Sequence, residues 1–549
     1  MMRTYRDFAL NFPCWTDWHL GAVLRHHAER TPDRVFLDVI DEPGSWTYSA
    51  ILGAAERVAQ NFLGHGAHPG DRVVIMAGNS SELIRSWFGS ALAGLVEVPL
   101  NTAYEHEFLA HQLRVSTPRW AVIDDMYAVR FGGGGVAAAC PDVEHFWVID
   151  TGHLDEALSV LTALGRSASP WPELDRAVAD PRPFPAVRAQ DLASIFFTSG
   201  TTGPSKGVAM PHAQMYFFAQ QDVNLTRLTT DDTYLSLTPL FHGNAQFLAA
   251  YPALVAGARF VTRRKFSASR WIDHVRDYDV TVTNFIGVMM DFVWKQPPRP
   301  DDGDNHLRCV YAAPTAFSIV EQFQERYGIE AFVEAFGLTE TSMPFMTPYG
   351  VPRPAGAVGL KVADWFDVRL VHPETDMEVA VGELGELVVR PRHPWTAGMG
   401  YYNMPEKTTQ AWRNLWFHTG DAMRRDEDGW YYFVDRFKDA LRRRGENISS
   451  YEVEQAILGH DEVLECAVIG VPAAVDAGED EVMACVVLAE GADATAKDLW
   501  AWCDRTLPKF AVPRFIRFCA ELPKSPSQKI QKARLRDKGV TADTLARDS

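Results

Sequence analysis

Strand-like and helix-like segments alternate in the first part of this chain, and the alternation limits the folds available to it. Residues 71–79, DRVVIMAGN, form an apolar run that leads into a turn, and residues 81–96 carry apolar side chains at helical spacing. Short apolar runs follow at 97–101, 119–124 and 146–150. Strands that alternate with helices predict layered sheets covered by helices, the α/β class.

The pattern changes near residue 435, where a smaller unit begins. Two strand-like runs at 463–471 and 481–491 precede a helical stretch at 496–507 and a strand at 513–522, so an α+β unit of about 110 residues is expected. A chain of 549 residues is also too long for one hydrophobic core. The sequence predicts a large N-terminal domain, a hinge and a small mobile C-terminal domain. Their expected ranges are 1–434, 435–438 and 439–549.

The charge and the apolar patterning exclude several classes of protein. The formal net charge of −18 argues against a nucleic-acid-binding protein, which needs a basic face. The most apolar later stretch, 247–261, is too short for a membrane span and contains Pro252 and Gly257. The N-terminal segment lacks an apolar run of signal-peptide length, and the seven cysteines form no CxxC pair. We therefore expect a cytoplasmic protein with reduced thiols and no integral membrane association.

Glycine, serine and threonine residues surround one lysine, Lys206, in the segment FFTSGTTGPSKGVAMPH at 196–212. A P-loop of the nucleoside-triphosphatase type requires G-x-x-x-x-G-K-[ST]. From Gly200 the chain reads GTTGPSKG, so it lacks the glycine before the lysine and the hydroxyl after it. The segment is not a P-loop of that type, although its donors suit phosphate groups. A second glycine-rich run, FGGGGVAAA at 131–139, does not directly follow a strand and is expected to be a flexible surface loop.

Five segments, taken in order, resemble the signature segments of the adenylate-forming superfamily. They are TSGTTGPSKGV (198–208), EAFGLTETS (334–342), FHTGD (417–421), DRFKDALRRRGENIS (435–449) and LPKSPSQKIQK (522–532). The superfamily includes acyl- and aryl-CoA synthetases, the adenylation domains of peptide synthetases, and luciferases. Two further stretches, 239–246 and 442–454, most resemble the crotonobetaine/carnitine–CoA ligase-like group. The resemblance implies an acyl-CoA synthetase-like fold with a mobile small domain.

The resemblance also implies which residues contact the nucleotide. The glycine-rich loop would cover the β- and γ-phosphates of ATP, with Lys206 beside the departing pyrophosphate. Thr339 would contact a phosphate, Asp421 would accept both ribose hydroxyls, and Arg436 would support the ribose and phosphate side. The family usually has a glycine-rich segment at the adenine, where this chain has Ala-Ala-Pro. The implied ATP and AMP contacts are Thr198, Ser199, Gly200, Thr201, Thr202, Gly203, Lys206, Ala312, Ala313, Pro314, Thr339, Asp421, Arg436 and Lys529.

Catalysis is implied for residues in three of the segments. Lys529 would bridge the carboxylate and the α-phosphate in the first step only, and it follows Gln528 where the family commonly has glycine. His242 would gate the thiol or orient the carboxylate, with a core histidine as the alternative interpretation. Glu340 would be a ligand of Mg²⁺ together with Thr201, because the ion prefers hard oxygen ligands. The implied catalytic set is Lys529, His242, Thr339 and Glu340.

The resemblance also implies which residues bind CoA, form the hinge and line the acyl pocket. Gly445 would let the pantetheine arm approach the main chain, and Arg442, Arg443 and Arg444 would meet the CoA phosphates or form a solvated charged face. Lys438 stands where the family has its hinge residue. Apolar walls and two amides would form the acyl pocket, which indicates a small or medium acid. Its expected members are His242, Asn244, Gln246, Phe285, Gly287, Val288, Met289 and Phe336.

The predicted function is a carboxylate–CoA ligase that converts ATP, an acid and CoA to acyl-CoA, AMP and pyrophosphate, with Mg²⁺. Activation is needed because a carboxylate is a poor electrophile, and the site must neutralise and align two anionic reactants. One alternative passes the acyl group to a carrier-protein pantetheine, an amine or another nucleophile. A second is a catalytically silent relative that binds the ligand. We expect a monomer or a homodimer.

Overall fold

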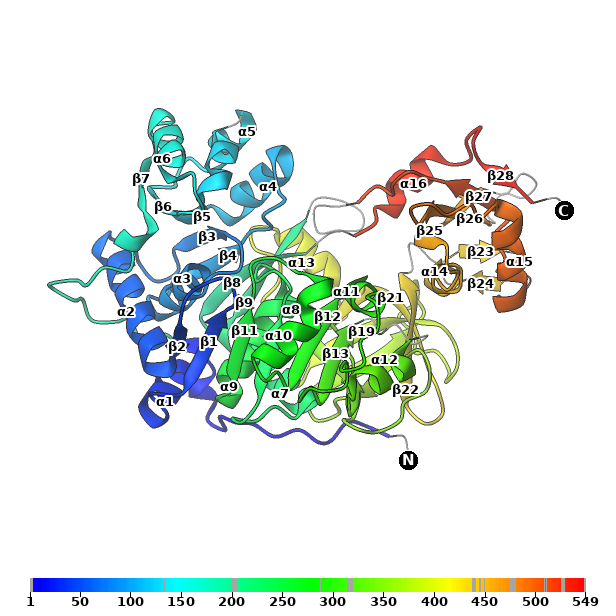
Figure 1. Cartoon of the computed structure of the whole chain (residues 1–549), viewed down its shortest axis with the longest axis horizontal. Helices are drawn as coiled ribbons and strands as arrows, with labels where there is room; N and C mark the ends of the chain where they lie inside the picture. Colours follow the sequence, from blue (N-terminus) through cyan, green and yellow to red (C-terminus); the bar gives the residue numbers. More distant parts are fainter. Residues whose placement is uncertain are drawn as a thin grey trace.

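The computed structural model describes most of the chain. The described residues are 3–132, 134–198, 205–286, 288–313, 315, 319–436, 441–443, 446–448, 450–472, 480–507, 509, 511–524 and 529–547. Within them, three sheets and their covering helices make up the large N-terminal domain, and a smaller sheet with its own helices follows (Figure 1). The α/β class and the large and small domains are therefore as predicted.

The first sheet contains the strands that the sequence predicts nearest the N-terminus. Its strand order is β7-β6-β5-β3-β4-β8-β9, and neighbouring strands are parallel except in the terminal β8–β9 hairpin. The strands are β3 (Arg72–Met76), β4 (Val96–Pro99), β5 (Trp120–Asp124), β6 (His145–Ile149), β7 (Ser167–Pro170), β8 (Leu192–Thr198) and β9 (Lys206–Pro211). The segment predicted to be helical at 81–96 contains helix α3 (Ser81–Leu92).

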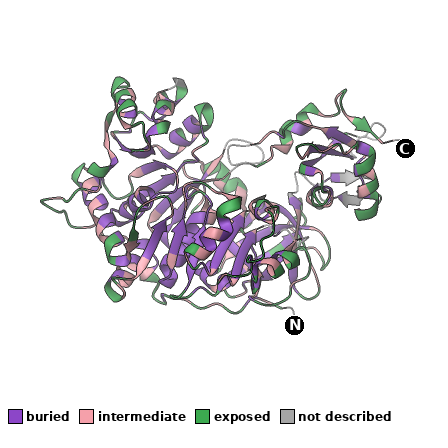
Figure 2. Cartoon of the chain, in the orientation of Figure 1, coloured by how far each residue is buried: buried purple, intermediate pink, exposed green. Residues whose placement is uncertain are grey.

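Side chains along these strands alternate between two cores, as the strand period of two requires. Val73 and Ile75 join a core shared with the second sheet, whereas Val74 and Met76 belong to the core on the other face. Both faces are therefore covered by helices, as in most parallel sheets (Figure 2). The helices of the two faces are α1 (Leu20–Arg30), α2 (Tyr48–Gly64) and α3 on one side, and α4 (His106–Ser116), α5 (Gly134–Ala139) and α6 (Leu154–Ala163) on the other.

The glycine-rich run at 131–139 is not the surface loop expected from the sequence. Residues 134–139 form α5, and Val136 and Ala139 are buried in the core beneath α4. These two apolar side chains lie three positions apart, so one face of a helix carries both. Burial of that face outweighs the low helix propensity of the glycines.

The second sheet has the strand order β14-β13-β12-β10-β11-β1-β2 and is parallel except for β1–β2. Its strands are β1 (Val35–Val39), β2 (Ser45–Thr47), β10 (Thr233–Ser236), β11 (Arg259–Thr262), β12 (Val282–Ile286), β13 (Cys309–Ala313) and β14 (Ala331–Val333). Its outer face packs on helices α10 (Trp271–Asp277), α11 (Val288–Trp294) and α12 (Val320–Tyr327).

The third sheet is antiparallel, with the order β15-β16-β17-β22-β21-β19-β18 and β20 beside β21. Its strands are β15 (Ala335–Leu338), β16 (Ser342–Met346), β17 (Ala357–Lys361), β18 (Phe366–Val371), β19 (Gly385–Pro391), β20 (Trp412–Arg413), β21 (Trp416–Arg425) and β22 (Trp430–Arg436). Helix α13 (Pro405–Ala411) precedes β20.

Helix α7 (His212–Thr226) joins the sheets through the middle of the large domain. Nearly all of its residues are buried, including several amides. The Gln221 amide donates to the Met343 carbonyl and accepts the Met343 N–H at 3.0 Å. Such pairing satisfies polar groups that would be costly to bury alone. The helix α9 (Tyr251–Ala256) packs beside α7, after the short helix α8 (Gly243–Ala245) and a π-helical turn at Gln246–Ala250.

The small domain is an α+β unit with two hydrophobic cores, one on each face of its main sheet. That sheet has the order β25-β26-β27-β28, and β23 pairs with β24. Its elements are β23 (Leu441–Arg443), β24 (Glu446–Ile448), α14 (Ser450–Leu458), β25 (Val463–Pro472), β26 (Asp480–Leu488), α15 (Ala496–Thr506), β27 (Phe515–Phe518), α16 (Lys532–Lys538) and β28 (Leu545–Ala546). The strands and the helix predicted in this region are all present.

Among the described residues, helix α14 of the small domain contacts β22 of the large domain. Asp435 accepts the main-chain N–H of Ser450 at 2.8 Å and also the Ser450 hydroxyl. The rings of Phe433 and Tyr451 meet edge to face, with centroids 6.2 Å apart. Strand β22 includes Asp435 and Arg436, which the sequence assigns to the hinge, and the domain boundary itself stays a prediction. Among the described helices, none combines the length and the apolar character needed to cross a membrane.

Candidate active site

The β8–β9 hairpin carries the two ends of the glycine-rich loop. Thr198 ends β8 and faces Lys206, the first residue of β9, in antiparallel register. Helix α4 contacts the adjoining residue, because His111 Nε2 lies 2.8 Å from the Ser205 carbonyl and Gln112 donates to the Ser205 hydroxyl at 3.3 Å. The position of Lys206 is therefore fixed by strand pairing. Ser199, Gly200, Thr201, Thr202 and Gly203 lie outside the described residues.

One tyrosine connects Lys206 with Glu340. Lys206 Nζ donates to the Tyr401 hydroxyl at 3.0 Å, and the hydroxyl donates to Glu340 Oε1 at 2.9 Å. The lysine ammonium also lies 4.3 Å from the centroid of the same ring, which is a cation–π distance. Tyr401 is buried, whereas Lys206 and Glu340 are half-buried. A cation and a carboxylate predicted to serve the phosphates and the metal thus lie at one place.

The main chain around Tyr401 is hydrogen-bonded to the segment of Glu340 and to the segment of Lys206. The N–H of Gly398 donates to the Glu340 carbonyl at 2.9 Å, and the N–H of Tyr402 donates to the Gly207 carbonyl at 2.7 Å. Gly400 has a φ of +115°, and a Cβ there would lie 2.6 Å from the Thr408 side chain. Only glycine fits this close, left-handed position.

Thr339 lies in the tight connection between β15 and β16. The amide of Gln214, on the buried helix α7, donates to the Thr339 carbonyl at 2.7 Å. Glu340 follows directly, so the same turn presents both residues predicted at the phosphates and the metal, and both are half-buried. Hydrogen bonds from Gln214 of α7 and from the main chain of Gly398 hold the turn in place.

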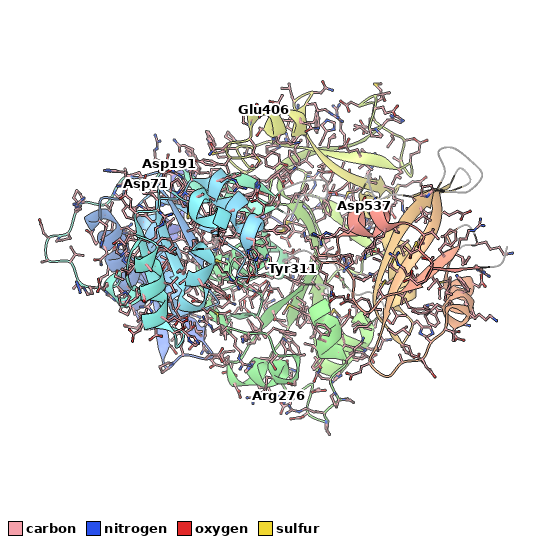
Figure 3. The ribbon with its side chains drawn as sticks, turned by 90° about the horizontal axis from the view of Figure 1, so that it is seen from above. Asp71, Asp191, Arg276, Tyr311, Glu406 and Asp537 are labelled. Atoms are coloured by element: carbon pink, nitrogen blue, oxygen red, sulfur yellow. The ribbon has the colours of Figure 1, made fainter. Side chains whose placement is uncertain are left out.

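The predicted adenine segment ends β13. Ala312 is buried and Ala313 half-buried, while Pro314 lies outside the described residues. The neighbouring Tyr311 lies toward the middle of the molecule in the view of Figure 3. The carbonyl of Ala312 accepts the Thr315 hydroxyl at 3.0 Å.

Beside this segment lies a buried ion pair that the sequence did not indicate. Arg353 donates to Glu334 Oε2 at 2.6 Å and to the Thr315 hydroxyl at 2.7 Å, and the two charged side chains are 9% and 5% exposed. A buried pair has little solvent to screen it. It therefore fixes the chain immediately after the adenine segment.

Asp421 is buried in β21, opposite Arg436 of β22 in the antiparallel register. The residue before it, Gly420, has a φ of +72°, and its N–H donates to Glu386 Oε1 at 3.1 Å. The Asp421 N–H donates to the Thr419 hydroxyl at 3.0 Å. The register brings the two residues predicted at the ribose to neighbouring strands of one sheet.

His242 and Lys529 come from different domains, and the structure brings them close. His242 stands at the start of α8, and burial together with the positive charge of Lys529 lowers the pKa of its ring to about 4. The imidazole is therefore neutral at neutral pH. Lys529 itself is exposed. The charge of a lysine from the small domain thus acts on a histidine of the large domain.

The residues predicted for the acyl pocket differ in exposure. Asn244, Met289 and Phe336 are half-buried, whereas Gln246 and Phe285 are buried, with 0% and 1% exposed. The amide of Gln246 donates to Glu97 Oε1 at 2.8 Å, and the amide of Asn284 donates to Asn244 Oδ1 at 2.8 Å. Both predicted amides thus have protein partners. Gly287 and the side chain of Val288 lie outside the description.

The predicted CoA and hinge residues fall mostly where nothing is described. Lys438, Arg444 and Gly445 lie outside the described residues, and Arg442 and Arg443 are placed only as main chain in β23. Phe336 stacks on Phe433 with ring centroids 5.9 Å apart, which places the predicted acyl residue beside β22.

Two protein-family models together match most of the chain. Residues 24–402 match the family described as AMP-binding enzyme, and residues 452–529 match the AMP-binding enzyme C-terminal domain. The chain belongs to the AMP-binding enzyme family. A crotonobetaine/carnitine–CoA ligase of Salmonella agona is 31% identical over 496 residues, which cover 89% of this chain and 93% of the relative.

Solved structures of similar enzymes share the fold. MatB of Rhodopseudomonas palustris with ATP bound is 27% identical with a TM-score of 0.77, over 95% of this chain and 99% of that one. The anthranilate CoA ligase AuaEII, in complex with anthranoyl-AMP, has a TM-score of 0.82 at 24% identity, over 95% and 97% of the two chains. The predicted superfamily and its two-domain architecture are confirmed. The roles of the individual site residues stay predictions.

Three contributors to the site were not found from the sequence. They are Tyr401, Gln214 and the Arg353–Glu334 pair. Tyr401 stands 195 positions from Lys206 and 61 from Glu340. The glycines beside it, Gly398 and Gly400, were the available signal, because such glycines often mark a close approach of main chains.

Proposed function

We propose that this AMP-binding enzyme is a carboxylate–CoA ligase that forms an acyl-adenylate from ATP and a small or medium acid. The adenylate then passes its acyl group to the thiol of CoA, with release of AMP. The observation that carries the proposal is the approach of Lys529, from the small domain, to His242 of the large domain. It supports the role of Lys529 as the catalytic lysine beside the acyl site.

The first step requires positive charge at two separate places. The acid carboxylate attacks the α-phosphorus, and the bond from that phosphorus to the bridging oxygen of pyrophosphate breaks. Lys529 stabilises the charge that collects on the carboxylate and α-phosphate oxygens, because donors placed in a site with little water act strongly on developing charge. Lys206, held by β9 and Tyr401, receives the departing pyrophosphate.

The second step replaces the adenylate by a thioester. The CoA sulfur attacks the acyl carbon, and the bond from that carbon to the AMP oxygen breaks as the thiol proton is released. A neutral His242 orients the carbonyl without adding charge. Rotation of the small domain about Lys438 withdraws Lys529 and opens the path for the thiol, as in other hinge-bending enzymes.

Magnesium fits this site as a partner of the ATP phosphates. No group of three or more His, Cys, Asp or Glu side chains in the described ranges could hold a metal ion by itself. Mg²⁺ needs fewer protein ligands, because it keeps waters and binds substrate phosphates together with one or two carboxylates. Glu340, beside Lys206 through Tyr401, would supply the carboxylate, and Thr201 is predicted to assist it. When bound, the ion shields the charge of the triphosphate.

The size of the acid follows from the residues around the predicted pocket. Phe336 and Met289 are half-buried and apolar, and the two amides already have partners in the protein. The relatives are named for crotonobetaine or carnitine and for anthranilate, all compact acids. These features favour a compact acid over a long fatty acid.

A panel of carboxylic acids in an ATP–pyrophosphate exchange assay tests the first half-reaction. AMP release with and without CoA then tests the acceptor. We expect exchange with at least one compact acid, and AMP release that depends on CoA. Turnover with a carrier-protein pantetheine or an amine in place of CoA would favour the alternative acceptor. Absence of exchange with every acid would favour a ligand-binding relative that is not a catalyst.

A further inference from the structure

We propose that Tyr401 is a positioning residue for the binding of MgATP. Its hydroxyl lies between Lys206 and Glu340 and keeps the ammonium and the carboxylate from pairing directly before the nucleotide binds. The proposal rests on the proposed function for the identity of the nucleotide, and it adds a residue that no signature segment predicted.

The phenol of Tyr401 uses each of its polar functions on one of the two charged groups. Its oxygen accepts from Lys206 Nζ at 3.0 Å, and its O–H donates to Glu340 Oε1 at 2.9 Å. The ring face adds the cation–π contact with the same ammonium, 4.3 Å from the centroid. A phenol is the side chain that can accept from a cation and donate to an anion at once through a single rigid atom.

This arrangement is built by the main chain. Tyr401 forms an antiparallel bridge with Val208, two residues beyond Lys206. On the other side, the N–H of Gly398 donates to the Glu340 carbonyl at 2.9 Å, and the Tyr401 N–H donates to the Thr408 hydroxyl at 2.8 Å. The residue is also buried, with 7% exposed, so neighbouring groups restrict the position of its hydroxyl. The main-chain contacts of Tyr401 therefore place its hydroxyl between Lys206 and Glu340.

The separation matters because Lys206 and Glu340 have different partners in the loaded site. The lysine is predicted to meet the phosphates and the carboxylate to meet the metal ion. A direct ion pair between them would compete with both contacts and would have to be broken for MgATP to bind. With the phenol between them, the two charged groups are joined through a neutral hydroxyl, and MgATP can bind without breaking a direct ion pair between them.

Tyr401→Phe is the decisive variant, because it keeps the ring and removes only the bridging oxygen. We expect the KM for MgATP in acid-dependent pyrophosphate exchange to rise by about 10-fold, the size of one hydrogen bond to a charged group. The kcat of exchange should change by less than about threefold. Thioester formation from a supplied acyl-adenylate should be unaffected, because that step uses no triphosphate.

Tyr402→Phe is the matched control. Tyr402 is the next residue, is half-buried, and packs against the core beneath α4, which contains neither Lys206 nor Glu340. It should leave the KM for MgATP within twofold of the parent value. Equal losses in both half-reactions, with a lower Tm in Tyr401→Phe, would show a structural role and would overturn the proposal. An unchanged KM in Tyr401→Phe would do the same.

A double variant separates the bridge from other effects of the missing oxygen. In a Lys206→Met background there is no ammonium to pair with Glu340, so adding Tyr401→Phe should raise the KM for MgATP no further. Independent, multiplicative effects would contradict the proposal. Binding of MgATP by isothermal titration calorimetry gives the same comparison as a dissociation constant. It decides the role of Tyr401 even where every acid fails in the exchange assay, an outcome that would count only against the proposed function.

Discussion

Asp435 and Ser450 lie on opposite sides of the predicted hinge, and their contact can be used to test whether the small domain moves. Asp435 belongs to β22, and one of its oxygens accepts the N–H and the hydroxyl of Ser450, the first residue of α14. The predicted rotation of the small domain would carry α14 away from β22. We predict that Asp435→Asn weakens the observed arrangement, which we propose to be the adenylating one, relative to the rotated one.

The size of the effect follows from the bonds that lose their charge. Hydrogen bonds to a charged group contribute about 1.5–3 kcal/mol and neutral ones about 0.5–1.5. A carboxylate beside a helix N-terminus adds about 0.3–1 kcal/mol. Because asparagine can still accept one of the two bonds, we expect a net loss of about 1–2 kcal/mol, which is a factor of about 5–30 in the equilibrium.

The assay measures the two half-reactions separately. Pyrophosphate exchange reports adenylation, and the conversion of a supplied acyl-adenylate with CoA reports thioester formation. The ratio of the second rate to the first should rise by up to about 5–30-fold in Asp435→Asn. Asp426→Asn is the control, because Asp426 accepts from Trp430 and Tyr432 at the other end of β22, within the large domain. An equal fall of both rates in Asp435→Asn would refute the reasoning, because it would show loss of fold without a change in domain position.

Three further predictions concern the lysine of the small domain, its histidine neighbour and the ion pair near the adenine segment. Lys529→Ala should abolish adenylation and leave thioester formation from supplied acyl-adenylate largely intact; loss of both half-reactions would remove the role assigned to that lysine. The same variant should raise the pKa of His242 from about 4 toward its ordinary value, because a nearby positive charge disfavours the imidazolium, while burial keeps it below 6.5. Nuclear magnetic resonance of the histidine ring measures this, and an unchanged pKa would mean that the two residues do not approach in solution. Arg353→Met should lower the free energy of unfolding in urea by about 3–5 kcal/mol, because Glu334 would be left buried without its positively charged partner. Arg390→Met, whose pair with Asp367 is 43% and 38% exposed, should cost less than about 1 kcal/mol, and equal losses in both would contradict the argument.

The architecture was predictable where the residues of one segment alone indicate whether that segment is buried. The runs that became β3 and β5 are apolar except for Arg72 at the start of β3 and Asp124 at the end of β5, as expected of strands covered on both faces. The helix α5 was missed because four successive residues with no side chain conceal the two that pack, Val136 and Ala139. Local glycine content predicted a loop, and a core formed with a distant helix decided otherwise.

The site was predictable only as far as its signature segments reach. Lys206, Glu340 and Asp421 each lie in such a segment, and the fold places them on β9, on the β15–β16 turn and on β21. Tyr401 has no chemistry of its own that would single it out. Its importance comes from the meeting of three strands and turns far apart in sequence, which only the folded structure reveals.

The hydrogen bonds of Gln246 and Asn244 have a consequence for any attempt to change the accepted acid. Gln246 pairs with Glu97 on β4, whose pKa burial raises to about 8, and Asn244 pairs with Asn284 on β12. Each amide predicted at the acyl pocket thus shares its polar group with a strand of a different sheet. Exchanging Gln246 alone would leave the buried Glu97 carboxyl without this partner, at a cost of about 1–3 kcal/mol. Exchanging Asn244 alone would cost less, because Asn284 also donates to the Asn244 main-chain carbonyl at 3.0 Å. If Gln246 lines the acyl pocket as predicted, a change of the accepted acid at this position would also change folding stability, and a redesign would have to exchange Gln246 and Glu97 together.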